Sequence, residues 1–494
     1  MSASDFPSTP IGLPASFKNE LPMSISDECK SYTLNVFPET NDTIVGPGPA
    51  APVFVANSSG GSWPFTRQRV VFNIPNGGSD SVFLDPVATT LTFRMSYRVI
   101  TPSAGGASTA MQLIGSGASW FDRLELYSST GQLIERIDEY GLLQNFLLQN
   151  TVSMSERWGG IGVSMGADSN SANGIDLPIT PIATTYFFSF TIPLLSVIGV
   201  NSDKHFPIGL TKGMQLVMHT SDSIPIANYC TTIPTTQPVF SQITLDSFSL
   251  NLRYVNVGRD AAQQLRQTLQ AGKWLLKSTT YLTSITQIPN GTVGPYQTEL
   301  GIRGSSIRSI LHQFGIQTST QCLNGIYDAI NPALNRRQLL IGAAKYPSRE
   351  ISDLNRPSEA YTYLIHALGG GMAKSLGTTV LREAYNAVFP SVPAGSDAAC
   401  VAPSNGVRAS PTGSDSGVSL YQNMLKFPNA AYYGYDLERV NSVLFSGVNT
   451  KQQAPVLNLN FAAAMTRIVT CYAWGMADCI IEIDAATKEV KAFV

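Results

Sequence analysis

The segment LTFRMSYRV, from Leu91 to Val99, alternates apolar and polar residues without interruption. Its apolar positions are Leu91, Phe93, Met95, Tyr97 and Val99. Successive side chains of a β-strand point to opposite faces, so a period of two predicts a strand with one buried face. The rest of the chain can be interpreted from this segment, because the same period recurs in the residues that follow it.

Further strands with this period are predicted in both halves of the chain, and helices are few. In the first half they are Trp120–Leu126, its hairpin partner Gln132–Arg136 across the turn Ser128–Gly131, Tyr186–Ile192, Gln215–Thr220 and Phe248–Tyr254. In the second half they are Lys273–Ile288, Glu299–Phe314, and a last hairpin in which Cys479–Ile483 pairs with Val490–Val494, so that the C-terminus is expected to be buried in a sheet. Helices are predicted at Asp138–Asn150, Asp260–Ala271, Ser358–Leu368 and Thr379–Val388. Many strands with few intervening helices favour an all-β antiparallel sandwich over a parallel sheet.

The order of these elements divides the chain into two β units. Residues 1–65 are rich in Pro, Ser and Gly and are predicted to form an extended N-terminal arm and loop. Residues 66–258 form the first unit, residues 259–272 a connector helix, and residues 273–494 the second unit. A large loop is predicted at residues 369–417.

The composition excludes several classes of protein. Among 494 residues only 13% are charged, against about 25% in an average soluble domain, and the net charge is −2. This balance excludes a strongly basic nucleic-acid-binding protein, and the hydrophobic fraction of 43% excludes a disordered chain. Low net charge favours association. We see no signal peptide and no apolar run long enough for a membrane helix, and the six scattered cysteines are predicted to be free thiols.

Several segments, from Phe83–Pro86 in the first unit to Cys471–Val494 in the second, resemble the double jelly-roll major capsid proteins of viruses, of the virophage and polinton-like type. In the first unit these are Phe83–Pro86 leading into the Leu91 strand, and Ile114–Tyr127 with its hairpin. In the second unit they are Asp436–Glu438, Phe445–Thr450, Leu457–Phe461 and the closing Cys471–Val494. The resemblance covers residues 65–494 and rests on the order of the segments.

The resemblance implies two consecutive eight-stranded antiparallel jelly rolls per chain. It further implies a homotrimer with a pseudo-hexagonal outline that tiles the icosahedral shell of a double-stranded DNA virus. The implied partners are neighbouring capsomers, penton proteins, and minor capsid or cement proteins. The implied location is the virion, assembled in the cytoplasm or nucleus of the host. On this view the segments 150–181 and 369–417 face outward, while the N-terminal arm lies beneath the capsomer.

We expect no catalytic, cofactor-binding or metal site, although several patterns partly match the motifs of such sites. Gly162–Gly166 matches the G-x-S-x-G pattern, but its flanks indicate a polar loop. Gly301–Ser306 and the glycines at 369–371 lack the lysine of a phosphate-binding loop. The four histidines, His205, His219, His312 and His366, form no metal motif, and Cys322 with His312 is a weak nucleophile pair.

Acidic and basic groups give the remaining alternatives. Glu125 and Glu135 lie across the predicted hairpin and could serve a carbohydrate-cleaving enzyme, but both are expected to face solvent. Asp478, Glu482 and Asp484 could hold an ion, yet a solvated strand face is the simpler interpretation. The pairs Arg336–Arg337 and Arg303/Arg308 are predicted to be small basic spots, too few for nucleic-acid binding. The alternatives to a major capsid protein are therefore a carbohydrate-binding or carbohydrate-cleaving β-sandwich, or a minor capsid component.

Overall fold

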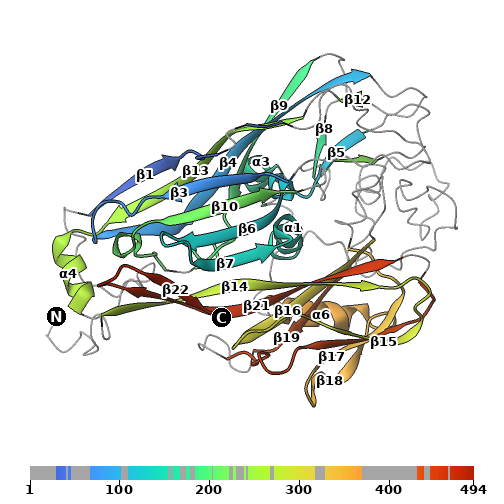
Figure 1. Ribbon diagram of the computed structural model, residues 1–494. Helices are drawn as coiled ribbons and strands as arrows, with labels where there is room; N and C mark the ends of the chain where they lie inside the picture. The colour runs from blue at the N-terminus through green and yellow to red at the C-terminus, as the bar shows by residue number, and fades with distance from the viewer. Residues whose placement is uncertain are drawn as a thin grey trace, which may run out of the picture.

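Two β units lie side by side in the computed structural model, and one helix joins them at one end (Figure 1). The structure describes residues 29–40, 43–45, 67–101, 110–153, 156, 160–166, 174–177, 184–202, 204–221, 226–229, 239–240, 243–267, 272–316, 329–369, 431–438, 446–465 and 468–494. All the named strand pairs are antiparallel. The predicted all-β class, two consecutive antiparallel jelly rolls with a few short helices, is confirmed.

The first jelly roll packs a six-stranded sheet on a four-stranded sheet. The larger sheet has the order β1-β13-β4-β12, with β2 beside β13 and β9 beside β4, and the smaller has the order β3-β10-β6-β7. A further small sheet has the order β11-β5-β8. The strand bounds are β1 Lys30–Val36, β2 Thr43–Val45, β3 Arg69–Ile74, β4 Val82–Thr101, β5 Ala110–Ile114, β6 Phe121–Ser128, β7 Leu133–Asp138, β8 Gly174–Leu177, β9 Thr185–Pro193, β10 Met214–Thr220, β11 Ile226–Tyr229, β12 Val239–Phe240 and β13 Thr244–Asn256.

The core of the first jelly roll confirms the alternation of the opening segment. Leu91, Phe93, Met95 and Tyr97 in β4 are all at most 1% exposed. The ring of Phe93 lies 5.2–5.7 Å from three other phenylalanine rings, which come from β6, β9 and β13. Each buried aromatic side chain of this kind contributes roughly 1.5–3 kcal/mol of burial free energy.

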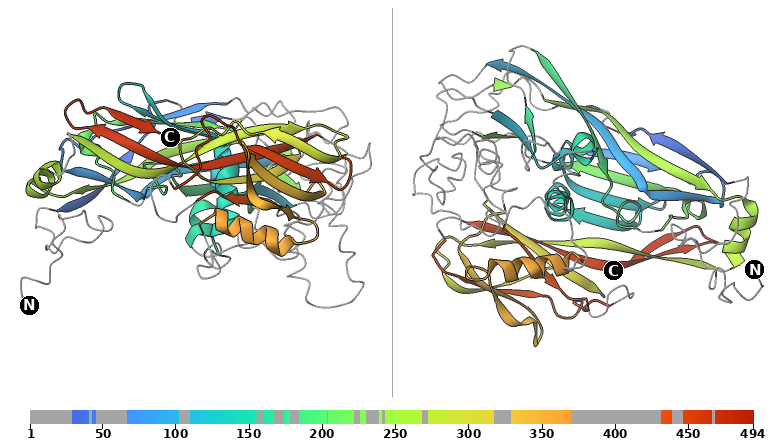
Figure 2. Two further views of the ribbon diagram at one scale, coloured as in Figure 1. Left: turned by 90° about the horizontal axis from the view of Figure 1, so that it is seen from below. Right: turned by 180° about the vertical axis from the view of Figure 1, so that it is seen from behind.

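The second jelly roll packs a five-stranded sheet on a four-stranded one. The first has the order β14-β21-β16-β19 with β22 beside β21, and the second has the order β15-β20-β17-β18. The two rolls face each other through β7 of the first and β14 of the second, whereas β17 and β18 lie on the far side (Figures 1 and 2). The bounds are β14 Lys273–Ile288, β15 Gly294–Glu299, β16 Ile307–Ile316, β17 Leu334–Ile341, β18 Ala344–Ser352, β19 Tyr432–Asp436, β20 Val456–Phe461, β21 Val469–Asp484 and β22 Val490–Phe493.

Short helices occupy the connections between strands. Helix α4 runs between the two rolls where the connector helix was predicted, and α1 packs beside β6 (Figure 1). The bounds are η1 Gly117–Trp120, α1 Tyr140–Thr151, α3 Gly160–Met165, η2 Ile208–Leu210, α4 Arg259–Gln267 and α6 Pro357–Ala367. The predicted helix at 379–388 and residues 370–417 of the predicted loop lie outside the described residues.

Three sequence predictions of strand layout need revision. Glu299–Phe314 is not one strand: β15 ends at Glu299 and β16 begins at Ile307, because the intervening segment bonds to the 446–450 loop instead, as when Gly304 N–H donates to Thr450 Oγ1. Within the predicted N-terminal arm, Lys30–Val36 is an edge strand paired with β13. The C-terminal strand β22 does pair with β21, but its Phe493 is 51% exposed.

Candidate functional site

The junction between the two jelly rolls is the site at which distant parts of the sequence meet. Strand β7 lies beside β14, and in the described residues side-chain hydroxyl groups of β14 bridge the gap. Thr280 Oγ1 donates to Glu135 Oε1 at 2.7 Å, Thr283 Oγ1 donates to the Asp138 carbonyl at 3.0 Å, and Ser278 Oγ donates to the Asn201 carbonyl at 3.3 Å. Hydrogen bonds from residues 278–283 of β14 therefore help to fix the position of one roll relative to the other.

Glu135 is the central polar group of this junction. Its other oxygen, Oε2, accepts from the hydroxyl of Ser196 and from the backbone N–H of Val197 at 2.9 Å, so the carboxyl joins three segments. The residue is 4% exposed. Burial raises the pKa of Glu135, and the three hydrogen bonds only partly counteract that effect.

Apolar contacts complete the junction. The ring of Phe146 in α1 meets the ring of Tyr432 at 4.9 Å and that of Trp474 at 5.7 Å, both from the second roll. Phe83 in β4 lies edge-on to Trp274 in β14 at 6.1 Å. These aromatic rings come from β4 and α1 of the first roll and from β14, β19 and β21 of the second. They belong to one apolar cluster that continues from one roll into the other.

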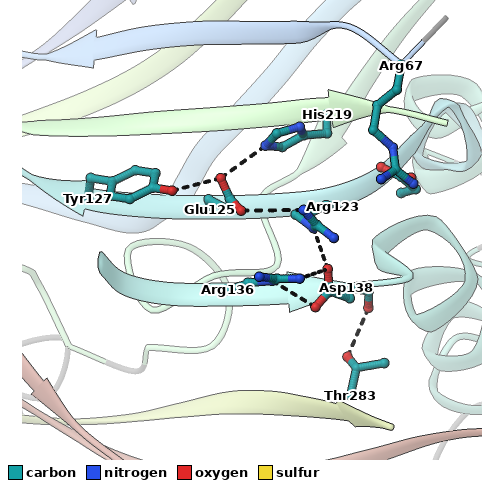
Figure 3. A network of polar contacts seen from close by, with 9 residues as sticks. Arg67, Arg123, Glu125, Tyr127, Arg136, Asp138, His219 and Thr283 are labelled. Atoms are coloured by element: carbon teal, nitrogen blue, oxygen red, sulfur yellow. Dashed lines mark hydrogen bonds and ion pairs between the residues drawn. The ribbon is translucent and has the colours of Figure 1, made fainter. Parts of the chain in front are cut away.

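A second polar cluster lies on the outer face of the β6–β7 hairpin (Figure 3). Glu125 Oε2 accepts from the Tyr127 hydroxyl at 2.9 Å and lies 3.0 Å from His219 Nε2, while Arg123 pairs with Asp138. Arg136 pairs with the same Asp138 carboxylate at 2.9 Å. This outer network therefore alternates acids with bases along three neighbouring strands.

The pKa values of this network follow from those partners. Desolvation pushes the pKa of Glu125 upward, but the hydrogen bonds from His219 and Tyr127 and the charge of Arg123 outweigh it, so the pKa lies below its usual value. Desolvation lowers the pKa of His219, and the positive charges of Arg123 and Arg69 lower it further. The hydrogen bond and the negative charge of Glu125 raise this pKa, but they do not outweigh the other effects. A neutral His219 therefore donates to an ionised Glu125 at neutral pH.

The prediction that Glu125 and Glu135 both face solvent is wrong, since they are only 8% and 4% exposed. The register pairs Glu125 with Arg136 and Leu126 with Glu135, so the two glutamates point to opposite faces of the sheet. Glycosidases need two acids on either side of one substrate bond. These two carboxyl groups do not share a cleft, and the structure does not bring them together.

The Arg336–Arg337 pair is likewise not a basic surface spot. Arg336 is exposed, whereas Arg337 is 1% exposed and donates to Asp353 Oδ1 at 2.9 Å. The guanidinium carbon of Arg337 lies 4.9 Å from the ring centroids of both Tyr433 and Tyr435. Burial raises the pKa of Asp353 to about 6, against the attraction of the arginine. This cluster stabilises the interior of the second roll.

The predicted acidic face near the C-terminus is also different in the structure. Asp478 is fully buried and accepts from Ser306 Oγ at 2.7 Å, with Lys277 Nζ 3.8 Å away. Glu482 pairs with Lys273 at 2.7 Å, and Asp484 accepts from two backbone N–H groups of its own turn. The three acids do not converge, and within the described residues no group of three His, Cys, Asp or Glu could hold a metal ion.

The remaining candidates do not assemble into a catalytic arrangement among the described residues. Ser164 lies inside the short helix α3 rather than in the predicted loop, and a nucleophile elbow would place it at the turn before a helix. His312 is fully buried and stacks on Tyr433 at 5.0 Å, while Cys322 lies outside the described residues. Arg303 and Arg308 pair with Glu299 and Glu438.

The cysteines that the structure describes are free, as predicted. They are Cys29, Cys471 and Cys479, and the last two are buried. Burial raises the pKa of both buried thiols to about 12, which makes them poor nucleophiles. The other three cysteines lie outside the described residues.

Comparison with known proteins gives a match in structure only. No protein-family model matches the sequence, and no curated protein matches it. The mavirus major capsid protein superposes with a TM-score of 0.51 at 8% identity, covering 99% of this chain and 96% of that one. The Faustovirus major capsid protein gives 0.51 at 8% identity, with 92% and 90% covered. A chain of the Sputnik virophage gives 0.50 at 11% identity, with 96% and 90% covered.

The chain thus has the double jelly-roll fold that these viral major capsid proteins share, as its sequence resemblance implies. The likeness extends over nearly the whole length of the chain and of each of these proteins. In the described residues no helix is long and apolar enough to cross a membrane.

Proposed function

We propose that this chain is the major capsid protein of a double-stranded DNA virus, and that three copies form a pseudo-hexagonal capsomer of an icosahedral shell. The observation that carries the proposal is the union of two jelly rolls through a buried junction within one chain. Three such chains around a threefold axis present six similar wedges, and a nearly hexagonal outline fills a lattice without gaps. Rigid coupling of the two wedges is what the outline requires, and the Glu135 junction supplies it.

The surface and the composition support a protein built for association. Exposed large apolar side chains are spread over both rolls, among them Phe37, Phe187, Leu275 and Ile285. Low net charge removes electrostatic repulsion between copies. The capsid proteins with this fold named above are parts of viruses by their titles, and the same role here needs neither catalysis nor a cofactor.

The proposal includes the partners and the location of the protein. Each trimer contacts neighbouring capsomers, and penton and minor capsid or cement proteins close and strengthen the shell. The protein acts in the virion after assembly in the cytoplasm or nucleus of the host. A minor capsid component is the alternative with the same fold, and it differs in copy number. The carbohydrate enzyme has no support, because Glu125 and Glu135 lie on opposite faces.

Electron micrographs of the purified protein test the proposal. We expect class averages with a hexagonal outline and threefold symmetry. Particles holding one copy, or a twofold pair, would contradict it. A stained gel of virions that contain this chain then distinguishes the alternatives, since a major capsid protein is the most abundant band and a minor component is a faint one.

A further inference from the structure

A charged cleft lies on the second jelly roll, between β17, β18 and the start of α6. Its volume is 570 Å³, within the range of ligand sites. Seven residues line it: Arg336, Arg349, Glu350, Ser352, Asn355, Arg356 and Glu359. Five of these seven are charged, in a chain with only 13% charged residues. The cleft is therefore much richer in charged side chains than the chain as a whole.

The arginines of the cleft outnumber its acids by three to two. Arg349 and Arg356 both bind the carboxylate of Glu359, so one acid serves two cations. Arg336 lies 3.8 Å from Glu350, which is an ion pair without a hydrogen bond. A guanidinium carries five N–H donors, and these contacts leave most of them without a partner in the described residues.

The start of α6 adds to the positive potential of the cleft. Arg356 occupies the N-cap position and makes no side-chain cap hydrogen bond, and Pro357 follows it. The eleven-residue helix therefore directs uncapped N–H groups and the positive end of its dipole toward the same region. The cleft has one positive charge in excess, together with this partial charge.

We propose that this cleft binds an acidic segment of a partner polypeptide, whose carboxylates take over arginines now held by Glu350 and Glu359. Exposed ion pairs are weak, so a bidentate carboxylate–guanidinium pair can replace them at little cost. The two glutamates disfavour a nucleic acid, whose continuous phosphates need a stripe of basic residues. The β17–β18 side lies away from the first jelly roll (Figures 1 and 2), so the described residues of that roll do not cover the cleft.

Fluorescence anisotropy with a labelled hexaglutamate peptide tests this inference on the full-length protein. We expect saturable binding that Arg336→Gln with Arg349→Gln weakens at least about tenfold, the effect of losing one charge-assisted hydrogen bond. Arg303→Gln is the matched control, because Arg303 is an exposed arginine with one glutamate partner that does not line the cleft, and it should leave binding unchanged. Glu359→Gln frees two arginines and should tighten binding.

Several results would overturn the inference. They are an absence of saturable peptide binding, equal loss in the Arg303 control, and weaker binding by Glu359→Gln. Tighter binding of a twelve-residue oligothymidylate than of hexaglutamate would assign the cleft to nucleic acid instead, and full competition by inorganic phosphate at equal concentration would assign it to small anions. Circular dichroism of each variant confirms that it is folded. None of these outcomes depends on the shell function, so the two proposals can fail separately.

Discussion

The outer face of the β6–β7 hairpin and the junction behind it hold two glutamates ten residues apart in opposite electrostatic surroundings. Glu125, on the outer face, has a histidine, a tyrosine and an arginine as partners, and its pKa is lowered. Glu135, in the junction, has only neutral donors, and the titratable groups that face it are Tyr140, Tyr281 and Cys479. Its pKa is raised. The outer face of the hairpin therefore carries paired charges, whereas the junction face surrounds its carboxyl group with neutral groups.

This difference shows how a two-roll chain can be rigid where its halves meet. The half-exposed members of the outer network, such as the Arg136–Asp138 pair, can exchange partners at little cost. A buried carboxyl held by two hydroxyls and one N–H cannot, because each donor that loses it is left unsatisfied. The junction therefore fixes geometry, and the outer network adapts to solvent. Four predictions test this contrast, in order of decreasing size.

Removing the aromatic part of the junction should have the largest effect. Trp474→Ala should lower the free energy of unfolding by about 3–5 kcal/mol, because Trp474 is fully buried against Phe146 of the other roll. Chemical denaturation monitored by circular dichroism measures the change. Phe187→Ala is the control: that side chain is 59% exposed, so its loss should cost about 0.5 kcal/mol or less. Equal losses would mean that the junction contributes no more than the surface.

Removing one donor from the buried carboxyl should have the next largest effect. Thr280→Val deletes the hydroxyl that binds Glu135 Oε1 and should cost about 1–3 kcal/mol. Thr283→Val is the matched variant, since its hydroxyl binds only the Asp138 carbonyl, and it should cost about 0.5–1.5 kcal/mol. The difference is read from paired urea titrations. If Thr283→Val is the more damaging change, Glu135 is not the centre of the junction.

The pH dependence of Glu135 should have a defined sign. Because its folded pKa is raised, the folded chain binds a proton more tightly than the unfolded chain. Its contribution is therefore fully present at low pH and is lost as pH rises from the usual glutamate value through the folded one. Glu135→Gln abolishes this loss, so relative to wild type it should gain stability between pH 4 and pH 8. Unfolding free energies at the two pH values measure it, and a relative loss on raising pH would contradict the account.

Glu125 should show the opposite sign and the smallest effect. Its lowered pKa means that its stabilisation is present above the usual glutamate value and is lost as pH falls through the folded one. Glu125→Gln should cost less than about 1 kcal/mol at pH 7, since the charge-assisted bonds are partly screened by solvent, and this cost should shrink as the pH falls from 7 to 3. Thermal unfolding across this range gives the comparison. A slope of the same sign as that of the Glu135 variant would remove the contrast.

Much of the fold could be predicted from sequence, because period-two alternation is a local property. The opening segment, both hairpins and the connector helix follow from residue spacing alone. One buried residue that was predicted to be exposed also follows a local pattern. Arg337 shares its parity with the buried Leu339 and Ile341 in β17, so the alternation places it inside. Two adjacent arginines also fit a charge run on the surface, and for Arg337 that interpretation is wrong.

The junction could not be predicted in the same way. Glu135 has the parity of the buried Ile137, but its partner Thr280 lies 145 residues away in the other roll. No pattern within the hairpin predicts that the edge of a second sheet will cover the Glu135 side chain. Asp478 was missed for the same reason, since its burial depends on Ser306, 172 residues away. Burial by a distant element is a property of the tertiary structure and not of local spacing.

The mass of the purified protein in solution tests the central claim most directly. Light scattering coupled to size exclusion should give a species of three times the 53.1 kDa chain mass. A protein that stays at one chain mass across the accessible concentration range would contradict the assignment as a shell-forming trimer.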